Sequence, residues 1–228
     1  MTQNKSLVTN ARLAGLAYLL MFVAAALATV MRKGIIVSGD AAATSANIMA
    51  HQGAYLAAFA GDILVVAIYV VVVALFYRMF EPVNKSLARV AAAFGLMGCA
   101  IQATSALFQL APLSVLGGDS YLATFSTPQL QALAYMFLKI YSQAYGVALV
   151  FFGFFCLTTG YLIFRSTFLP RFLGVLLMIT GFAWMAFLFP PFATRYLAFI
   201  MATSLSEVVL ALWLLVKGVD EAKWLQSS

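Results

Sequence analysis

The sequence predicts an all-α protein of the membrane, a polytopic bundle of six transmembrane helices with both termini in the cytoplasm. Of its 228 residues, 64% are hydrophobic and only 9% are charged, and the mean hydropathy is +1.01. A soluble domain of this length needs many more polar residues to cover its surface. Uncharged runs of about 18 or more residues are typical of helices that cross a hydrocarbon core about 30 Å thick.

Six apolar runs are long enough to span a membrane, and we expect them to form one domain over residues 1–228. The first run ends in Ala26-Leu27-Ala28 and so resembles a cleaved signal peptide. Because it is long enough to span, we interpret it as the first membrane helix. The six predicted spans are residues 13–31, 53–77, 89–111, 130–163, 171–189 and 196–216.

The connection after the first span carries signals for the start of a helix. Gly39-Asp40 and Thr44-Ser45 contain residue types that cap helix N-termini. A helix from Ser45 to Phe80 would be about 54 Å long at about 1.5 Å per residue. We therefore expect its first turns to project from the membrane, tilt or bend, and Gly53 is one place for a bend.

The fourth span shows the same excess length. Pro128 after Thr127 fits the first turn of a helix, and the apolar pattern continues to Arg165. Before this helix, Gly117-Gly118-Asp119 predicts a turn between the third and fourth spans. The third and fourth spans are therefore expected to form a helical hairpin.

Lysine and arginine residues collect on one side of the predicted bundle, which orients it by the positive-inside rule. Both termini are then cytoplasmic, and the basic residues are dispersed over the helix ends rather than gathered on one face. This distribution argues against a nucleic-acid interface, although the net charge is +6. The cytoplasmic residues are Lys5, Arg12, Arg78, Lys85, Arg89, Arg165, Arg171, Lys217 and Lys223, against Arg32, Lys33 and Arg195 on the other side.

Charged and amide side chains inside the spans are the candidate functional residues, because placing Asp, Lys or Arg at a helix centre costs about 2.5–3.5 kcal/mol. At about 1.5 Å per residue, Asp62, Gln102 and Glu207 lie about 24, 20 and 15 Å above the cytoplasmic anchors of their helices. Lys139 and Gln143 fall near the outer boundary. These heights place the polar groups in the outer half of the membrane and suggest a cavity that opens outward.

Helical spacing supports a shared polar interior, since Tyr55 and Asp62 lie on one helix face. For glutamines and serines, packing between helices is the favoured alternative. For Asp62 and Glu207 we favour function, because an unpaired carboxylate there would be protonated or need a partner. Lys139 is the only cation positioned to pair with Asp62, and the alternative is that its side chain extends to water at the outer boundary. The predicted site residues are Tyr55, Asp62, Gln102, Lys139, Gln143 and Glu207.

Several chemistries are excluded by composition. His51 is the only histidine, so a bis-histidine haem and a histidine-rich zinc site are ruled out. Cys99 and Cys156 lie inside apolar runs, where we expect buried, unpaired thiols. No glycine-rich phosphate loop occurs. We therefore expect no metal, no cofactor and no catalytic residues of a familiar type.

Four segments carry a resemblance to an uncharacterised family of bacterial membrane proteins, the domain-of-unknown-function family 4386. The segments are RLAGLAYLLMF from residue 12, the pair Gly61-Asp62, FGFFCLTTGYLIFRSTFLPRFLGVLL from residue 152, and LALWLLVKG from residue 210. The resemblance covers nearly the whole chain. It implies a six-helix integral membrane protein of the bacterial cytoplasmic (inner) membrane and supplies no activity.

Three functions remain open from the sequence. The first is binding or transport of a small or lipid-like molecule through the outward polar cavity. The second is a membrane scaffold or partner subunit whose polar residues only fix helix packing. The third is an intramembrane enzyme that uses Asp62 or Glu207 as an acid or base. The lipid bilayer is the one partner that all three require, and the sequence does not indicate an oligomeric state.

Overall fold

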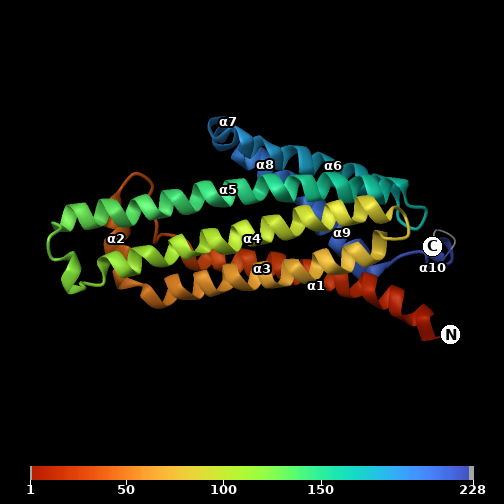
Figure 1. The fold of residues 1–228 in the computed structure, drawn as a ribbon, viewed down its shortest axis with the longest axis horizontal. Coiled ribbons are helices and arrows are strands. Elements are labelled where there is room, and N and C mark those ends of the chain that lie inside the picture. Colours follow the sequence, from red (N-terminus) through yellow and green to blue (C-terminus); the bar gives the residue numbers. More distant parts are fainter. Residues whose placement is uncertain (1, 226–228) are drawn as a thin grey trace. The chain divides into compact units, whose positions relative to one another are not determined.

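The computed structural model describes the backbone of residues 2–225 and the side chains of residues 9–224, and this part of the chain contains helices and no strands (Figure 1). Lys5, which belongs to the charge pattern above, lies outside the described side chains. The long helices are α1 (Thr2–Arg32), α3 (Gln52–Phe80), α4 (Lys85–Leu116) and α5 (Thr127–Arg165). The shorter ones are α2 (Ala41–Ala50), η1 (Ser120–Leu122), α6 (Arg171–Trp184), η2 (Met185–Leu188), α7 (Pro190–Arg195), α8 (Leu197–Thr203), α9 (Leu205–Val216) and α10 (Glu221–Leu225).

Six stretches of the described residues are long and apolar enough to cross a membrane. Each end of a predicted span lies within five residues of the observed one, so the all-α class and the six spans are confirmed. The observed stretches are Thr9–Arg32, Gln52–Phe80, Lys85–Leu116, Thr127–Arg165, Arg171–Leu188 and Leu197–Val216.

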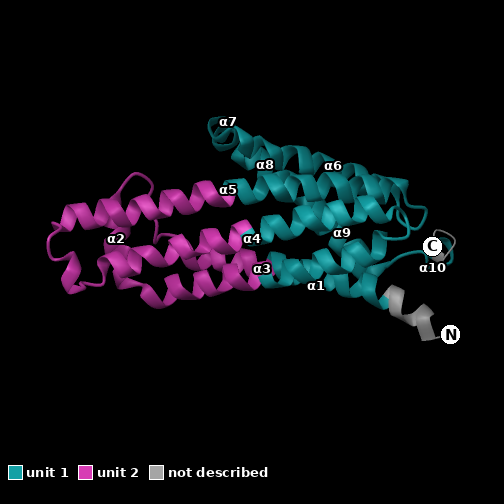
Figure 2. Ribbon diagram, viewed as in Figure 1, with its two compact units in different colours: residues 1–22, 67–100, 146–228 teal, residues 23–66, 101–145 magenta. Residues whose placement is uncertain are grey.

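The chain forms two compact units (Figure 2). Unit 1 comprises residues 1–22, 67–100 and 146–228, and unit 2 comprises residues 23–66 and 101–145. Helices α1, α3, α4 and α5 each contribute residues to both units. The expectation of one domain stays a prediction.

In unit 2, the connection between α1 and α3 folds into the short helix α2. The side chain of Asp40 caps this helix, because its Oδ1 accepts a hydrogen bond from the Ala43 N–H at 2.8 Å. The helix ends at His51, so the continuous helix expected from Ser45 is interrupted there. The break lies two residues before Gly53, the bend position that the sequence suggested.

A small cluster of buried apolar residues lies beside α2 in unit 2. Ile35, Ile48, Tyr55 and Leu138 are all buried, and Leu113 packs against them. These residues come from the α1–α2 connection and from α2, α3, α4 and α5. The cluster therefore ties the connection to the ends of the three long helices.

In unit 1, pairs of glycines allow α5 and α6 to approach closely. A Cβ atom added to Gly153 would lie 2.8 Å from the carbonyl oxygen of Gly181, and one added to Gly160 would lie 2.7 Å from that of Gly174. Real Cβ atoms do not come so close to a backbone oxygen, so any side chain here would push the helices apart. Small residues at such interfaces are typical of packed membrane helices.

The sixth span of the protein is interrupted at Ser204, between α8 and α9. The Thr203 hydroxyl donates to the Ile200 carbonyl at 2.7 Å, and the Ser204 hydroxyl donates to the Met201 carbonyl at 2.6 Å. Hydroxyls bonded back to carbonyls three residues earlier tighten a helical turn and bend the helix. The interruption leaves Glu207 in the first turn of α9.

Candidate functional site

Asp62 forms the centre of a polar cluster in unit 2. Its Oδ2 atom is ion-paired with the guanidinium of Arg32, and the two side chains are only 15% and 19% exposed. The same oxygen accepts hydrogen bonds from Gln109 Nε2 at 2.7 Å and from the Tyr141 hydroxyl at 3.4 Å. The four residues come from α3, α1, α4 and α5, so every long helix contributes one side chain to this cluster.

Two buried polar atoms of the Asp62 cluster have no hydrogen-bond partner. They are the donor Nε of Arg32 and the acceptor Oε1 of Gln109. The orientation of the Gln109 amide is fixed, because the oxygen of the Asp62 carboxylate requires the amide nitrogen as its donor. Tyr55 holds the same turn of α4 in place, since its hydroxyl donates to the Gln109 carbonyl at 2.7 Å.

The pairing of Lys139 with Asp62, which the sequence left open, is not found among the ion pairs of the described residues. The partner is Arg32, which the charge count had assigned to the external connection. At about 1.5 Å per residue, the 20 residues after Arg12 raise Arg32 by about 30 Å, close to the height of Asp62. Lys139 is exposed, and its Nζ lies 5.2 Å from the ring centroid of Tyr135, within range of a cation–π contact.

The other residues of the predicted site differ in their exposure. Gln143 is exposed on α5, as is Lys139 one turn before it. Gln102 is buried on α4, and its backbone carbonyl accepts a hydrogen bond from the Ser105 hydroxyl at 2.7 Å. Of the six predicted residues, Tyr55 and Asp62 lie in one cluster, because both contact Gln109. Tyr55 bonds to its backbone carbonyl, and Asp62 bonds to its side-chain amide.

Glu207 forms a second polar centre, in unit 1. Its Oε1 accepts a hydrogen bond from the Trp184 indole N–H at 3.0 Å, and its Oε2 accepts one from the Tyr18 hydroxyl. The residue is only 5% exposed. None of the ion pairs found among the described residues includes it. Its two direct partners are therefore uncharged.

Aromatic rings enclose the Glu207 centre. The ring of Tyr18 meets those of Tyr69 and Phe76 edge to face, with centroids 6.0 and 5.8 Å apart. An indole N–H can only donate, so Oε1 of Glu207 is an acceptor whether or not the carboxyl carries a proton. A hydroxyl both donates and accepts, so the Tyr18 contact suits either protonation state.

The two carboxylates of the predicted cavity belong to different units, Asp62 to unit 2 and Glu207 to unit 1. A shared cavity that opens outward stays a prediction. Within the described residues, no three His, Cys, Asp or Glu side chains form a group that could hold a metal ion. Cys99 and Cys156 are free and buried, as expected.

Comparison with known proteins gives the family of this chain. The sequence profile of a domain of unknown function, DUF4386, matches residues 13–218. The chain belongs to the DUF4386 family. An uncharacterized protein of Archaeoglobus fulgidus is 25% identical over 158 residues, which are 69% of this chain and 82% of the relative. No solved structure matches the chain.

The predicted site of this DUF4386 protein omits five residues that bind the two carboxylates: Arg32, Gln109 and Tyr141 at Asp62, and Tyr18 and Trp184 at Glu207. Gln109, as an amide inside a predicted span, belongs to the class of candidate residues that the sequence singles out. Arg32 and Tyr18 could have been found, because heights counted along α1 place them near the carboxylates of other helices. Trp184 and Tyr141 gave no such signal, since an aromatic residue in an apolar span is most often a packing residue. Membership of the family confirms the resemblance seen in the sequence, and it assigns no activity.

Proposed function

We propose that this protein is a multi-pass membrane protein that binds and transports a small or lipid-like molecule at the Asp62 cluster. The observation that supports this proposal is the pair of unpartnered buried atoms, Arg32 Nε and Gln109 Oε1. A buried polar atom without a partner costs about 1–3 kcal/mol, so native proteins keep few of them. A ligand that satisfies both atoms would recover that cost on binding.

The chemistry of the two atoms limits the ligand. Arg32 Nε–H needs an acceptor, and Gln109 Oε1 needs a donor. A hydroxyl group or an amide supplies both. The Asp62–Arg32 pair is already neutral as a unit. The part of the ligand that contacts Arg32 and Gln109 therefore carries no net charge. We therefore propose an uncharged polar head, on a small molecule or on the polar end of a lipid-like one.

In the same proposal, Glu207 couples proton exchange to transport. Carboxylates buried in membrane helices often mark proton routes in transporters. The Glu207 carboxyl can keep its bond from Trp184 in both protonation states, while its contact with Tyr18 adapts to either. The one-residue interruption at Ser204, one turn earlier, gives the helix a place to bend when the proton moves.

We propose that the protein lies in the cytoplasmic membrane of a bacterium, with both termini on the cytoplasmic side. The support for this orientation is the excess of lysine and arginine at one set of helix ends. Reporter fusions after residues 33, 83, 118 and 168 should alternate between outside and inside. A reporter after residue 118 that is active only inside the cell would overturn this orientation.

Native mass spectrometry of the protein, purified gently from its own membranes, tests the ligand. The parent should retain a small molecule that Asp62→Asn and Gln109→Met lose. Gln102→Met is the matched control, since Gln102 is a buried glutamine on the same helix, and it should keep the ligand. A clean apo mass for the parent, or equal occupancy in Asp62→Asn, would refute the proposal.

The second candidate function is a scaffold or partner subunit, and exposed aromatic residues of unit 1 are where a partner would bind. Phe182, Phe189 and Phe199 are each about 70% exposed, at 68%, 70% and 70%. Lipid or another protein must cover such rings in a membrane. Gentle crosslinking in native membranes should capture one partner at these positions if the protein is a subunit, and lipid alone if it is not.

A further inference from the structure

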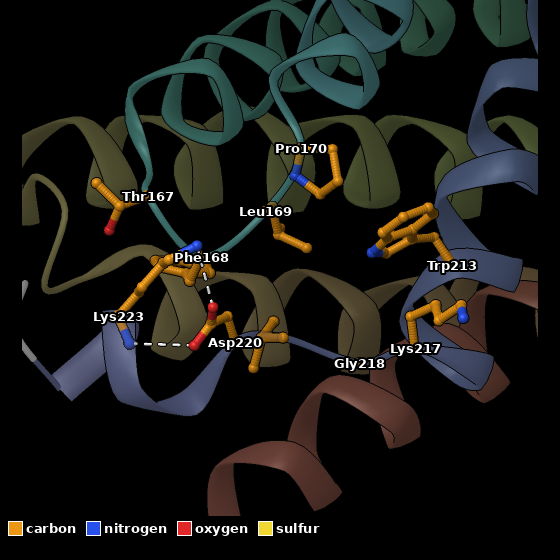
Figure 3. A pocket seen from close by; sticks show the side chains of 10 residues that line it. Thr167, Phe168, Leu169, Pro170, Trp213, Lys217, Gly218, Asp220 and Lys223 are labelled. Atoms are coloured by element: carbon orange, nitrogen blue, oxygen red, sulfur yellow. Dashed lines mark hydrogen bonds and ion pairs between the residues drawn. The ribbon is translucent and has the colours of Figure 1, made fainter.

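Unit 1 contains an open cavity of about 390 Å³ that is separate from both carboxylate centres (Figure 3). Its walls are two chain segments, residues 167–170 between α5 and α6 and residues 217–220 between α9 and α10. Trp213 on α9 and Lys223 on α10 complete the lining. The sequence had marked these positions as helix ends with basic residues and as parts of two segments that carry the family resemblance.

The two walls are fixed to each other and to the core. The Asp220 N–H donates to the Phe168 carbonyl at 3.2 Å. Phe168 is only 3% exposed and stacks on Phe80, with ring centroids 5.9 Å apart. Gly218 turns the second wall with a φ of +68°, a left-handed conformation that favours glycine. The cavity is therefore a built feature of the backbone rather than a gap between mobile side chains.

The lining combines an apolar side with a cationic rim. Leu169, Pro170 and Trp213 form the apolar side, and the indole of Trp213 is held edge to face by Phe172, with centroids 5.9 Å apart. An apolar wall next to positive charge suits a ligand that has an acyl or glycerol part and an anionic group.

The charged residues that line the cavity are Lys217, Lys223 and Asp220, so the lining carries a net positive charge. Lys223 Nζ lies 3.1 Å from Asp220 Oδ2, and this hydrogen bond holds the pKa of Asp220 below its usual value, so the pair stays formed at neutral pH. Lys217 takes part in none of the ion pairs found among the described side chains. One lysine of the rim is therefore left to attract an anion.

The cavity lies at the end of the sixth span, since α9 ends at Val216 and Lys217 follows it. This is where hydrocarbon gives way to lipid headgroups, and tryptophan is enriched at that depth. Basic pockets at the ends of membrane helices are typical sites for anionic headgroups. We propose that this cavity binds the phosphate group of an anionic phospholipid, with Lys217 on the phosphate and Trp213 against the glycerol and first acyl carbons.

Native mass spectrometry of the full-length protein, with added phosphatidylglycerol or phosphatidylcholine, tests this assignment. The parent should retain phosphatidylglycerol in preference. Lys217→Gln should lower its retention about fivefold, the size expected for one lysine near a headgroup. Lys85→Gln is the control for the loss of one lysine charge, because Lys85 is exposed at the start of another helix and does not line the cavity. The control should bind like the parent.

Inorganic phosphate distinguishes a lipid from a free anion. If the ligand is a lipid, millimolar phosphate displaces little phosphatidylglycerol, and Trp213→Ala lowers lipid retention further. Full displacement by phosphate, with Trp213→Ala binding like the parent, would assign the cavity to a free phosphate and overturn the lipid assignment. Equal retention of the two lipids, or equal losses in Lys217→Gln and Lys85→Gln, would overturn the site itself.

Discussion

Asp62 and Glu207 are the two carboxylates buried in the membrane spans, and the protein holds them in different ways. Asp62 faces the guanidinium of Arg32 and two neutral donors. Glu207 has two neutral donors, Tyr18 and Trp184, and no cation among the ion pairs of the described residues. One centre is a matched pair of charges, and the other is a titratable group enclosed by aromatic rings.

This difference separates a fixed binding site from a site that can change its charge. An ion pair that is largely buried, such as that of Arg32 with Asp62, is costly to break. A carboxyl with neutral partners can gain or lose a proton without leaving a second charge behind. The first three predictions below test that distinction, and the fourth measures an ion pair outside the membrane spans for comparison.

The largest effect is expected from Arg32→Met, which leaves the Asp62 charge buried without its cation. Removing one member of a buried ion pair costs about 3 kcal/mol. The double variant Arg32→Met/Asp62→Asn should recover more than half of that loss. Thermal unfolding in detergent measures both, and equal losses in the single and double variants would show that the pair contributes through packing alone.

The matched amide substitutions should differ between the two centres. Asp62→Asn leaves Arg32 without its counter-charge and should cost about 2 kcal/mol. Glu207→Gln keeps an acceptor for Trp184 and offers a donor to Tyr18, so its cost should stay below about 1 kcal/mol. The same unfolding assay compares them. A larger loss in Glu207→Gln than in Asp62→Asn would reverse the comparison.

Trp184→Phe removes the indole donor to Glu207 and keeps an aromatic ring in its place. A hydrogen bond to a charged group contributes about 1.5–3 kcal/mol and one to a neutral group about 0.5–1.5 kcal/mol. The loss on this substitution therefore reports the charge state of Glu207, and it should vanish in the Glu207→Leu background. A loss that persists there belongs to packing of the larger ring.

The smallest effect is expected from the partly exposed pair of Glu81 and Lys85. Hydrogen bonds from Lys85 and then Tyr77 hold the pKa of Glu81 below its usual value of 4.5. A carboxyl with a lowered pKa stabilises the fold above its unfolded pKa, and that contribution is lost as the pH falls through the folded pKa. The small difference in unfolding midpoint between the parent and Lys85→Gln should shrink between about pH 5 and pH 3. A difference that is constant over this range would exclude the ion pair as its cause.

The architecture could be predicted from the sequence because apolar length is a local property. Each of the six spans was found within five residues of its observed ends. Gly53 indicated a bend near His51, but the sequence did not predict that one helix ends at Ala50 and a second begins at Gln52. The break at Ser204 depends on hydroxyl bonds whose direction no pattern reveals.

The carboxylates could be predicted as important, but their partners depend on tertiary packing. Asp62 and Glu207 stand out because charge is rare in apolar spans. Lys139 was chosen for Asp62 by height alone, whereas the side of α5 that faces Asp62 carries Tyr141. The rotation of each helix about its own axis decides which side chains face each other. Heights counted along the helices give no information about that rotation.

Each of the three tryptophans reports on a different feature of unit 1. The indole N–H of Trp184 is bonded to Glu207, Trp213 lines the cavity beside Lys217, and Trp224 Nε1 donates to the Met79 carbonyl at 3.0 Å. Indole emission responds to nearby carboxyl groups and to solvent. Proteins that keep one tryptophan at a time would therefore carry built-in optical probes, one for the protonation of a buried acid and one for a lipid entering its cavity.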